Sequence, residues 1–197
     1  MSGATPTPLL LVSTSPQRRA ILAQLGIPFD VAHPRYDEKD TPGADPIELV
    51  RAHARGKARS LAGEAANRPV LGVDTAVLLD ERVFGKPADV SDARSMLARL
   101  AGRTHEVVSG LCLIGPGWEE LEHETTRVTF RELGTGEIDA YLGSDEWRGR
   151  AGAYAIQGLG ARLVARIEGD YLNVVGLPAA LLVSILTRRF PSVYGLG

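Results

Sequence analysis

The sequence predicts an α/β protein with a mixed central β-sheet flanked by helices. Short apolar runs typical of strands alternate with helical repeats near both ends of the chain, and two long strand-like runs follow one another in the middle. The chain has 197 residues, 44% hydrophobic and 23% charged, which suits one large domain or one domain in two lobes with a cleft between them. We therefore expect a single domain over residues 1–197, without a separate linker.

The first half of the chain predicts two strands and two helices. The run "LLLVS" is typical of a buried strand. The following "SPQRRAILAQLG" predicts a helix with Ser15 as its cap, Pro16 at its first position and Gly26 at its end. "PFDVAH" predicts a second short strand. A long helix is expected over about 46–65, because apolar residues recur there on one face.

The second half predicts a hairpin, a meander and further helices. "PVLGV", "AVLL" and "RVFG" alternate with turn residues as in a strand with a following hairpin, and a helix over about 91–100 is closed by Gly102. "THEVVSGLCLIGP" and "ELEHETTRVTFREL" predict two long antiparallel strands around the turn "GPGW". "GEIDAYLG" predicts a short helix, "ARLVARIEG" a strand, and "PAALLVSILTRRF" a C-terminal amphipathic helix.

Composition and charge exclude several classes of protein. The formal net charge of -2 leaves no basic excess of the kind that nucleic-acid binders show. No apolar run approaches the roughly 18 residues of a membrane span, and "MSGATPTPLLLVSTSP" lacks the basic start of a signal peptide. The single Cys112 stands in an apolar run and indicates a buried thiol rather than a nucleophile. We expect a soluble cytoplasmic protein without nucleic-acid or membrane partners, with a homodimer left open as an option.

The strand-to-helix junction "STSPQRR" predicts an anion site. Ser13, Ser15 and the unbonded N–H groups at the start of the helix can all face an anion. Positive charge is unfavourable near a helix N-terminus, so Arg18 and Arg19 in the first turn could respond to a bound anion. An ordinary cap followed by solvated arginines is the alternative.

Asp74 interrupts an otherwise apolar run in "VLGVDTAVLL". A carboxylate there needs a cation, a hydrogen-bond donor or a metal, because burying an unpaired charge is costly. An aspartate that caps a turn at the end of a strand is the alternative. Lys86 in "GKP" stands at the far end of the predicted hairpin, which could return it toward Asp74. Glu38 in "YDEKD" and Lys57 in "RGKARS" could serve the same site or be solvated surface residues.

The residues that could hold a metal favour a hard cation. The four histidines and the lone cysteine show no zinc-ligand spacing. A metal in this chain would be held by carboxylates and by phosphates of a substrate, so we expect Mg²⁺ or Mn²⁺. The motifs "GxxxxGK[ST]" and "GxGxxG" are absent, which removes the main support for a P-loop or Rossmann protein.

Seven segments of the chain together resemble the Maf family of nucleoside triphosphate pyrophosphatases. They are "STSPQRRAILAQLGIPFDV", "DEKD", "GKA", "VDTAVLLDERVFGKPAD", "ARSMLARLAGRTHEVVSG", "AGAYAIQG" and "IEGDYLNVVGLP". The likeness runs from about residue 10 to residue 186. It implies an elongated α/β fold with a mixed sheet and a cleft between two lobes. It also implies hydrolysis of a nucleotide between its α and β phosphates, which gives a monophosphate and pyrophosphate.

The resemblance also implies roles for individual residues. Ser13 and Arg18 match phosphate contacts of the family. Glu38 and Asp74 match the carboxylates that serve the metal and the attacking water, with Asp74 as the proton acceptor. The cations that meet the triphosphate are, on the same pattern, Lys57 and Lys86.

Two further motifs resemble the family branch that prefers dTTP and UTP. These are "DT", which includes Thr75, and "IQG", which includes Gln157; the branch that prefers 7-methyl-GTP typically carries "DQ" and "SEG". The resemblance implies that Thr75 and Gln157 contact the substrate and that Gln157 reads the edge of the base. Two residues depart from the pattern. Gln17, also a predicted substrate contact, stands where the branch commonly has arginine, and Arg150 stands where lysine is usual.

Two other functions compete with hydrolysis. One is a nucleotide-binding regulator of cell division or septum formation with little turnover, and the other is a nucleic-acid-binding module. The retained carboxylates and cations favour turnover, since a protein that only binds nucleotide would not need Asp74. The sequence leaves open the base preference, the role of modified nucleotides, the metal used in the cell, the oligomeric state and any link to cell division.

Overall fold

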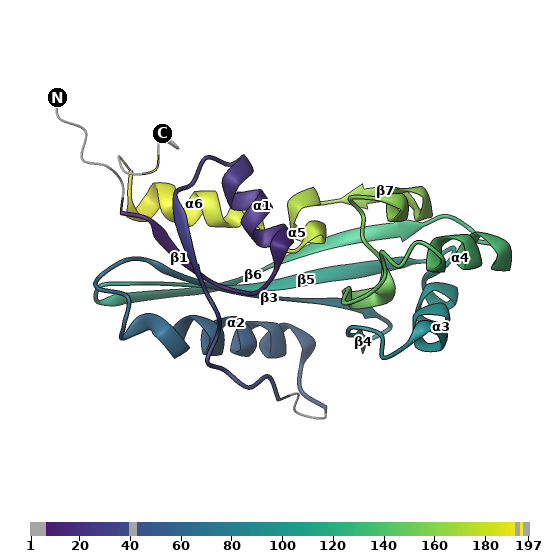
Figure 1. Cartoon of the computed structure of the whole chain (residues 1–197), viewed down its shortest axis with the longest axis horizontal. Coiled ribbons are helices and arrows are strands. Elements are labelled where there is room, and N and C mark those ends of the chain that lie inside the picture. The colour runs from purple at the N-terminus through teal and green to yellow at the C-terminus, as the bar shows by residue number, and fades with distance from the viewer. Residues whose placement is uncertain (1–6, 40–42, 192–193, 195–197) are drawn as a thin grey trace. The chain divides into compact units, whose positions relative to one another are not determined.

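The strands of the chain form one mixed β-sheet (Figure 1). The computed structural model describes residues 7–39, 43–191 and 194. Within these residues the sheet has seven strands in the order β2-β1-β3-β5-β6-β7, and β4 pairs with β3. The prediction of an α/β protein with a mixed sheet is therefore confirmed.

Parallel and antiparallel pairs are both present in the sheet. β1 is parallel to β2 and to β3, whereas β4 is antiparallel to β3 and β7 is antiparallel to β6. Each expected strand is present, and the runs on either side of Asp74 form one continuous strand, β3. The strands are β1 (Leu9–Val12), β2 (Phe29–Ala32), β3 (Val70–Leu79), β4 (Arg82–Phe84), β5 (Thr104–Gly115), β6 (Trp118–Phe130) and β7 (Val164–Glu168).

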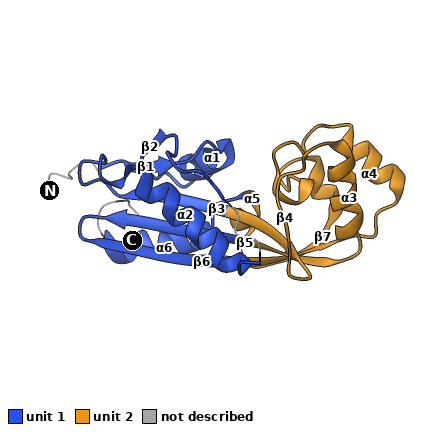
Figure 2. Ribbon diagram, turned by 90° about the horizontal axis from the view of Figure 1, so that it is seen from below, with its two compact units in different colours: residues 1–74, 109–124, 176–197 blue, residues 75–108, 125–175 orange. Residues whose placement is uncertain are grey.

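The chain divides into two compact units, which Figure 2 colours separately. Unit 1 comprises residues 1–74, 109–124 and 176–197, and unit 2 comprises residues 75–108 and 125–175. The boundary falls within β3, directly after Asp74, so the two halves of this strand belong to different units. The prediction of a single domain in two lobes with a cleft stays a prediction.

Unit 1 has helices on both faces of its strands (Figure 1). Helix α2 covers one face, and helices α1 and α6 cover the other. The predicted cap is present, because the Ser15 side chain accepts a hydrogen bond from the N–H of Arg18. Gly26, just beyond α1, has a φ of 67°, the left-handed conformation that commonly ends a helix. The bounds are α1 (Pro16–Gln24), α2 (Pro46–Ala62, three residues shorter than expected) and α6 (Ala179–Arg189).

The close approach of α2 to β3 is the feature of unit 1 that brings two of the predicted site residues, Lys57 and Asp74, together. A Cβ built at Gly72 would lie 2.2 Å from the carbonyl oxygen of Ala54 and 2.7 Å from the backbone nitrogen of Ala58. Only glycine fits such a contact, so the helix backbone lies directly on the strand. Leu10 and Leu61 are buried in the same cluster, and each large apolar side chain buried in this way stabilises the fold by about 1.5–3 kcal/mol.

Unit 2 contains helices α3 and α4 and three short helical segments. Its core joins Leu97, Phe130, Trp147 and Tyr154, all of them at most 6% exposed. The sequence does not predict the short segments, because helices of three to five residues are too brief to show a helical period. The bounds are α3 (Val90–Leu100), α4 (Thr135–Leu142), η1 (Ala151–Ala153), η2 (Leu159–Leu163) and α5 (Tyr171–Val175).

Two alternatives weighed on the sequence are settled by the described residues. Asp74 lies in the middle of β3, so it does not cap a turn at a strand end. Cys112 is fully buried, as expected of a structural thiol, and burial raises its pKa to about 12.

No helix in the described part of the chain combines the length and the apolar character needed to cross a membrane.

Candidate functional site

Lys57 lies between two carboxylates in unit 1. Its Nζ is 2.6 Å from Oδ1 of Asp74 and 2.9 Å from Oε1 of Glu38. The exposed fractions of the side chains of Lys57, Asp74 and Glu38 are 7%, 16% and 49%. Because a buried ammonium group needs compensating charge, the two carboxylates hold Lys57 in place. We call Glu38, Lys57 and Asp74 the charged set.

The packing of α2 on β3 brings Lys57 to Asp74. Side chains alternate along a strand, so Asp74 points to the same face of the sheet as Gly72, two residues earlier. Gly72 touches the backbone of α2 at Ala54 and Ala58, which flank Lys57 in the helix. Lys57 therefore stands on the turn of α2 that is closest to β3.

Glu38 is brought to the charged set by Tyr36, a residue that the sequence did not single out. A Cβ at Gly56 would lie 2.2 Å from the ring of Tyr36, so the ring occupies the space left by this glycine of α2. The hydroxyl of Tyr36 also lies 3.1 Å from Nδ1 of the buried His53. Burial raises the pKa of Tyr36, and the charges of Glu38 and other nearby carboxylates, Asp74 among them, raise it further.

The signal that could have revealed this anchor is the glycine itself. A glycine inside a helix destabilises it by roughly 0.5–1 kcal/mol relative to alanine, so Gly56 indicates that another group approaches the helix there. The motif "DEKD" ends at Asp40, which lies outside the described residues.

Arg18 is held within unit 1 rather than solvated. Its Nη1 donates to Oγ of Ser13 at 3.3 Å, and its Nε donates to the carbonyl of Gly176 at 2.8 Å. Burial lowers the pKa of Arg18, while the charges of Asp74 and Glu38 raise it. Since an arginine side chain keeps its proton in proteins, a permanent cation lies near the two carboxylates of the charged set.

Ser13 lies just before α1, and Gln17 lies in the first turn of this helix. Ser13 is 3% exposed, and its Oγ accepts the N–H of Ser15 at 3.1 Å as well as the bond from Arg18. Oε1 of Gln17 accepts a hydrogen bond from Oγ of Ser15 at 3.3 Å. Arg19 is exposed, as the alternative of solvated arginines requires.

The other three predicted residues lie in unit 2. Thr75 follows Asp74 on β3 and is partly buried, whereas Lys86 and Gln157 are exposed. The carbonyl of Gly85 accepts the N–H of Gly152 at 3.1 Å. The segment that carries Lys86 and the glycine-rich segment that carries Gln157 are therefore bonded to each other within unit 2.

Asp74 and Glu38 are the two side chains of the charged set that could take part in binding a divalent metal ion. Oδ1 of Asp74 and Oε1 of Glu38 both contact the same nitrogen of Lys57, so in this structure the two oxygens share the ammonium group. The described residues contain no group of three or more histidine, cysteine or acidic side chains that could hold a metal. Mg²⁺ is commonly bound in proteins by one or two carboxylates together with the phosphates of a substrate.

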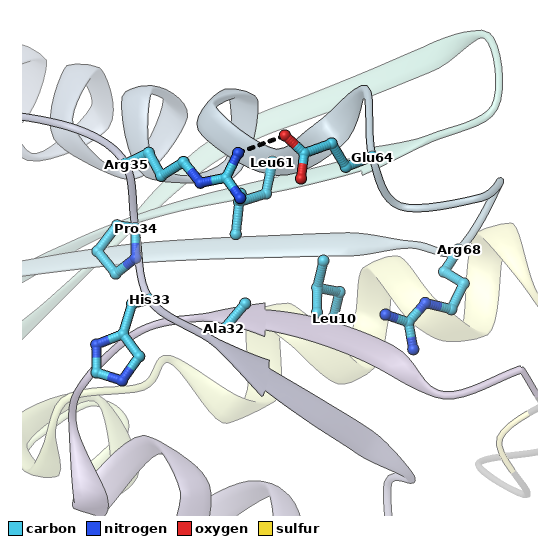
Figure 3. A pocket seen from close by; sticks show the side chains of 8 residues that line it. All are labelled: Leu10, Ala32, His33, Pro34, Arg35, Leu61, Glu64 and Arg68. Atoms are coloured by element: carbon cyan, nitrogen blue, oxygen red, sulfur yellow. Dashed lines mark hydrogen bonds and ion pairs between the residues drawn. The ribbon is translucent and has the colours of Figure 1, made fainter.

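Unit 1 also has a cavity of about 430 Å³, shown in Figure 3. Its guanidinium groups are already paired, that of Arg35 with Glu64 and that of Arg68 with Asp30. None of the predicted site residues lines it. The lining residues are Leu10, Ala32, His33, Pro34, Arg35, Leu61, Glu64 and Arg68.

The matching family model and the relatives found by sequence agree with the resemblance seen in the sequence. The family model for Maf-like protein matches residues 8–189. A dTTP/UTP pyrophosphatase of Nitratidesulfovibrio vulgaris is 48% identical over 185 residues, which are 92% of this chain and 88% of the relative. A dTTP/UTP pyrophosphatase of Symbiobacterium thermophilum is 46% identical over 180 residues, 91% of this chain and 93% of the relative. The solved structure of the Staphylococcus aureus Ham1 protein aligns with a TM-score of 0.41 at 12% identity, over 63% of this chain and 72% of that one.

Proposed function

This chain belongs to the Maf-like protein family, and from that premise we propose that it hydrolyses nucleoside triphosphates between the α and β phosphates. The products are a nucleoside monophosphate and pyrophosphate. The relatives that match over most of the chain are named dTTP/UTP pyrophosphatases. The structural observation that carries the proposal is the charged set, in which one buried lysine is bound by two carboxylates near Arg18.

Cations bind the triphosphate in this proposal. Negative charge grows on the leaving pyrophosphate during the reaction, so fixed positive groups aimed at it lower the barrier. Arg18 and Ser13 lie at the N-terminal end of α1, where backbone N–H groups also favour an anion. Lys57 and Lys86 supply the remaining positive charge.

Asp74 accepts the proton of the attacking water. The water oxygen bonds to the α-phosphorus, its proton passes to the carboxylate, and the bond from phosphorus to the bridging oxygen breaks to release pyrophosphate. The bond from Lys57 holds the carboxylate in one orientation, which favours a single direction of proton transfer.

Glu38 and Asp74 would hold Mg²⁺ or Mn²⁺ together with the substrate phosphates. When bound, such an ion would supply Lewis acidity to the phosphates and would make a nearby water more acidic. Asp74 would therefore have two roles, because it also accepts the proton of the water, whereas Glu38 would only help to bind the ion.

Gln157 selects the base. Its amide offers one donor group and one acceptor, which match the O4 and N3–H edge of uracil or thymine. A site whose polar groups would be left unpaired by the wrong base rejects that base strongly. We therefore propose a preference for UTP and dTTP over GTP and 7-methyl-GTP, with Thr75 and Gln17 as further substrate contacts.

A nucleotide screen tests the proposal. The protein is incubated with Mg²⁺ and single nucleoside triphosphates, plain and modified, and monophosphate and pyrophosphate are both measured. We expect the two products in equal amounts, and fastest with UTP or dTTP. Binding without pyrophosphate release would instead support the nucleotide-binding regulator, and release of orthophosphate would mean that another bond is cleaved.

A further inference from the structure

The segment that carries Gln157 is held on both sides of this residue. Before it, the N–H of Ala155 donates to the hydroxyl of Tyr141 at 3.0 Å. After it, the N–H of Leu159 donates to Oε2 of Glu146 at 2.8 Å. Gln157 itself is exposed between these two bonds.

The contact with Glu146 reaches the residue next to Gln157. The same oxygen, Oε2, lies 3.4 Å from the backbone nitrogen of Gly160, which donates to it. A Cβ built at Gly158 would lie 2.5 Å from Oε2 and 2.6 Å from Oε1 of this carboxylate. The backbone therefore passes directly over the carboxylate, and charged acceptors of this kind bind backbone N–H groups about twice as strongly as neutral ones.

Glu146 is itself fixed by its neighbours. The adjacent Trp147 is 2% exposed, and its indole N–H donates to the carbonyl of Leu142 at 3.0 Å. The N–H of Glu146 donates to Oγ of Ser144 at 3.3 Å. The carboxylate thus starts from a backbone that is anchored in the core of unit 2.

We propose that Glu146 is a positioning residue for base selection. Its carboxylate fixes the backbone of residues 158–160 and so sets the direction in which Gln157 presents its amide. This inference rests on the proposed function, because it assigns Glu146 to the selection that Gln157 makes. A purely structural Glu146 would instead support the fold and affect every nucleotide equally.

The test compares UTP with GTP in Glu146→Ala, Glu146→Gln and the control Glu168→Gln. Glu168 is another acidic residue of unit 2, whose carboxylate pairs with the side chains of Arg127 and Arg166. We expect Glu146→Ala to lower the ratio of kcat/KM for UTP to that for GTP at least fivefold, mainly through UTP. Glu146→Gln keeps an acceptor oxygen and should stay within about twofold of wild type, as should the control. Equal losses for both nucleotides, or an unchanged ratio, would overturn the proposal.

A second variant covers the case in which Glu146→Ala does not fold. Gly158→Ala places a Cβ against the carboxylate and should displace the same backbone, with a similar fall in the ratio. If Gly158→Ala leaves the ratio unchanged, the proposal is wrong. Amide hydrogen exchange gives a readout without substrate: Leu159 should exchange faster in Glu146→Ala than in the control, and equal rates would contradict the contact.

Failure of the inference can be told from failure of the proposed function. A wild-type protein that releases no pyrophosphate, or that shows no preference among bases, removes the function or its base selection, and the inference with it. A wild-type protein that prefers UTP, with the same ratio in folded Glu146→Ala, removes only the role of Glu146.

Discussion

The charged set of unit 1 and the glycine-rich segment of unit 2 hold their predicted site residues in opposite ways. In unit 1, the predicted site residues bind one another, and Lys57 forms ion pairs with Glu38 and Asp74. In unit 2, supporting side chains bind the backbone around Gln157 and leave its side chain exposed. The first arrangement suits strong charges, which need partners when buried, whereas the second suits an amide that, in the proposed function, meets a neutral base edge.

The difference implies that variants in the two regions should fail differently. Changes in the charged set should lower turnover of every nucleotide, because phosphates are common to all of them. Changes in the segment over residues 149–160 should instead alter the order of the nucleotides by kcat/KM. The following predictions test this contrast, from the largest expected effect to the smallest.

Removal of divalent ions should abolish turnover of all nucleotides. Glu38 and Asp74 are the carboxylates that would hold the ion, and the lysine and arginine side chains proposed to bind the phosphates cannot make a bound water more acidic as a metal ion does. The measurement is pyrophosphate release after treatment with EDTA, followed by addition of Mg²⁺ or Mn²⁺ to the same sample, which should restore it. Full activity after thorough chelation would remove the metal from the mechanism.

Asp74→Asn should lower kcat at least about a hundredfold for every nucleotide, within the usual range for loss of an acid–base group. The fold should persist, because Lys57 keeps its ion pair with Glu38. The matched control is Asp30→Asn in the same unit, which removes an aspartate paired with Arg68 and should leave kcat unchanged. A folded Asp74→Asn protein with a near wild-type rate would show that the proton goes elsewhere.

Acid should destabilise the protein through His105, which supports the glycine-rich segment. Nε2 of His105 lies 2.9 Å from the hydroxyl of Tyr154, and the rings of Phe130 and Tyr154 pack edge-on against it. Burial lowers the pKa of His105 from 6.5 to about 4. Between these values the folded protein binds fewer protons at His105 than the unfolded chain does, so the free energy of unfolding falls as the pH falls.

The expected loss from His105 is about 2 kcal/mol between pH 7 and pH 5. Denaturant unfolding at both pH values measures it, and His105→Gln should lose less stability on acidification by about this amount. The control is His123→Gln, which removes an exposed histidine and should keep the wild-type pH dependence. An equal pH dependence in wild type and His105→Gln would contradict the prediction.

Gln157→Glu should lower the ratio of kcat/KM for UTP to that for GTP about tenfold, with no general loss of turnover. This is the smallest of the expected effects. A glutamate offers only acceptors, which suit the N1–H and exocyclic amino group of guanine rather than uracil or thymine. The measurement is kcat/KM for UTP, dTTP, GTP and 7-methyl-GTP, with the exposed Gln24→Glu as a control of equal charge. An unchanged ranking would mean that Gln157 does not contact the base.

Local signals predicted most of the fold correctly. The cap at Ser15, the strand on either side of Asp74 and the amphipathic C-terminal helix are each written in a few neighbouring residues. The end of α2 was placed three residues late, because the apolar period continues past Ala62. The short helices of unit 2 have no such period and depend on contacts such as the one from Glu146.

The candidate site was predicted less completely than the fold. Resemblance supplied its residue types, but Tyr36, which anchors Glu38, and Glu146, which holds the segment of Gln157, were not found. Tyr36 contacts His53 and Glu146 contacts Leu159, residues that are more than ten positions apart along the chain. A pattern of neighbouring residues therefore does not reveal these contacts. In the sequence, only Gly56 and Gly158 indicate these contacts, since each lacks a side chain at the point where Tyr36 or Glu146 approaches the backbone.

The sequence by itself determined the strands and the longer helices, the cap at Ser15 and the family to which the chain belongs. These properties depend on periodicity, turn chemistry and motifs, which act over short stretches of chain. Only the tertiary structure decided which charges meet. Lys57 reaches Asp74 because Gly72 lets α2 lie directly on β3, and Glu38 reaches Lys57 because Tyr36 packs onto the same helix. Burial then makes the pairing obligatory, since a lone charge in such a place would be too costly to keep.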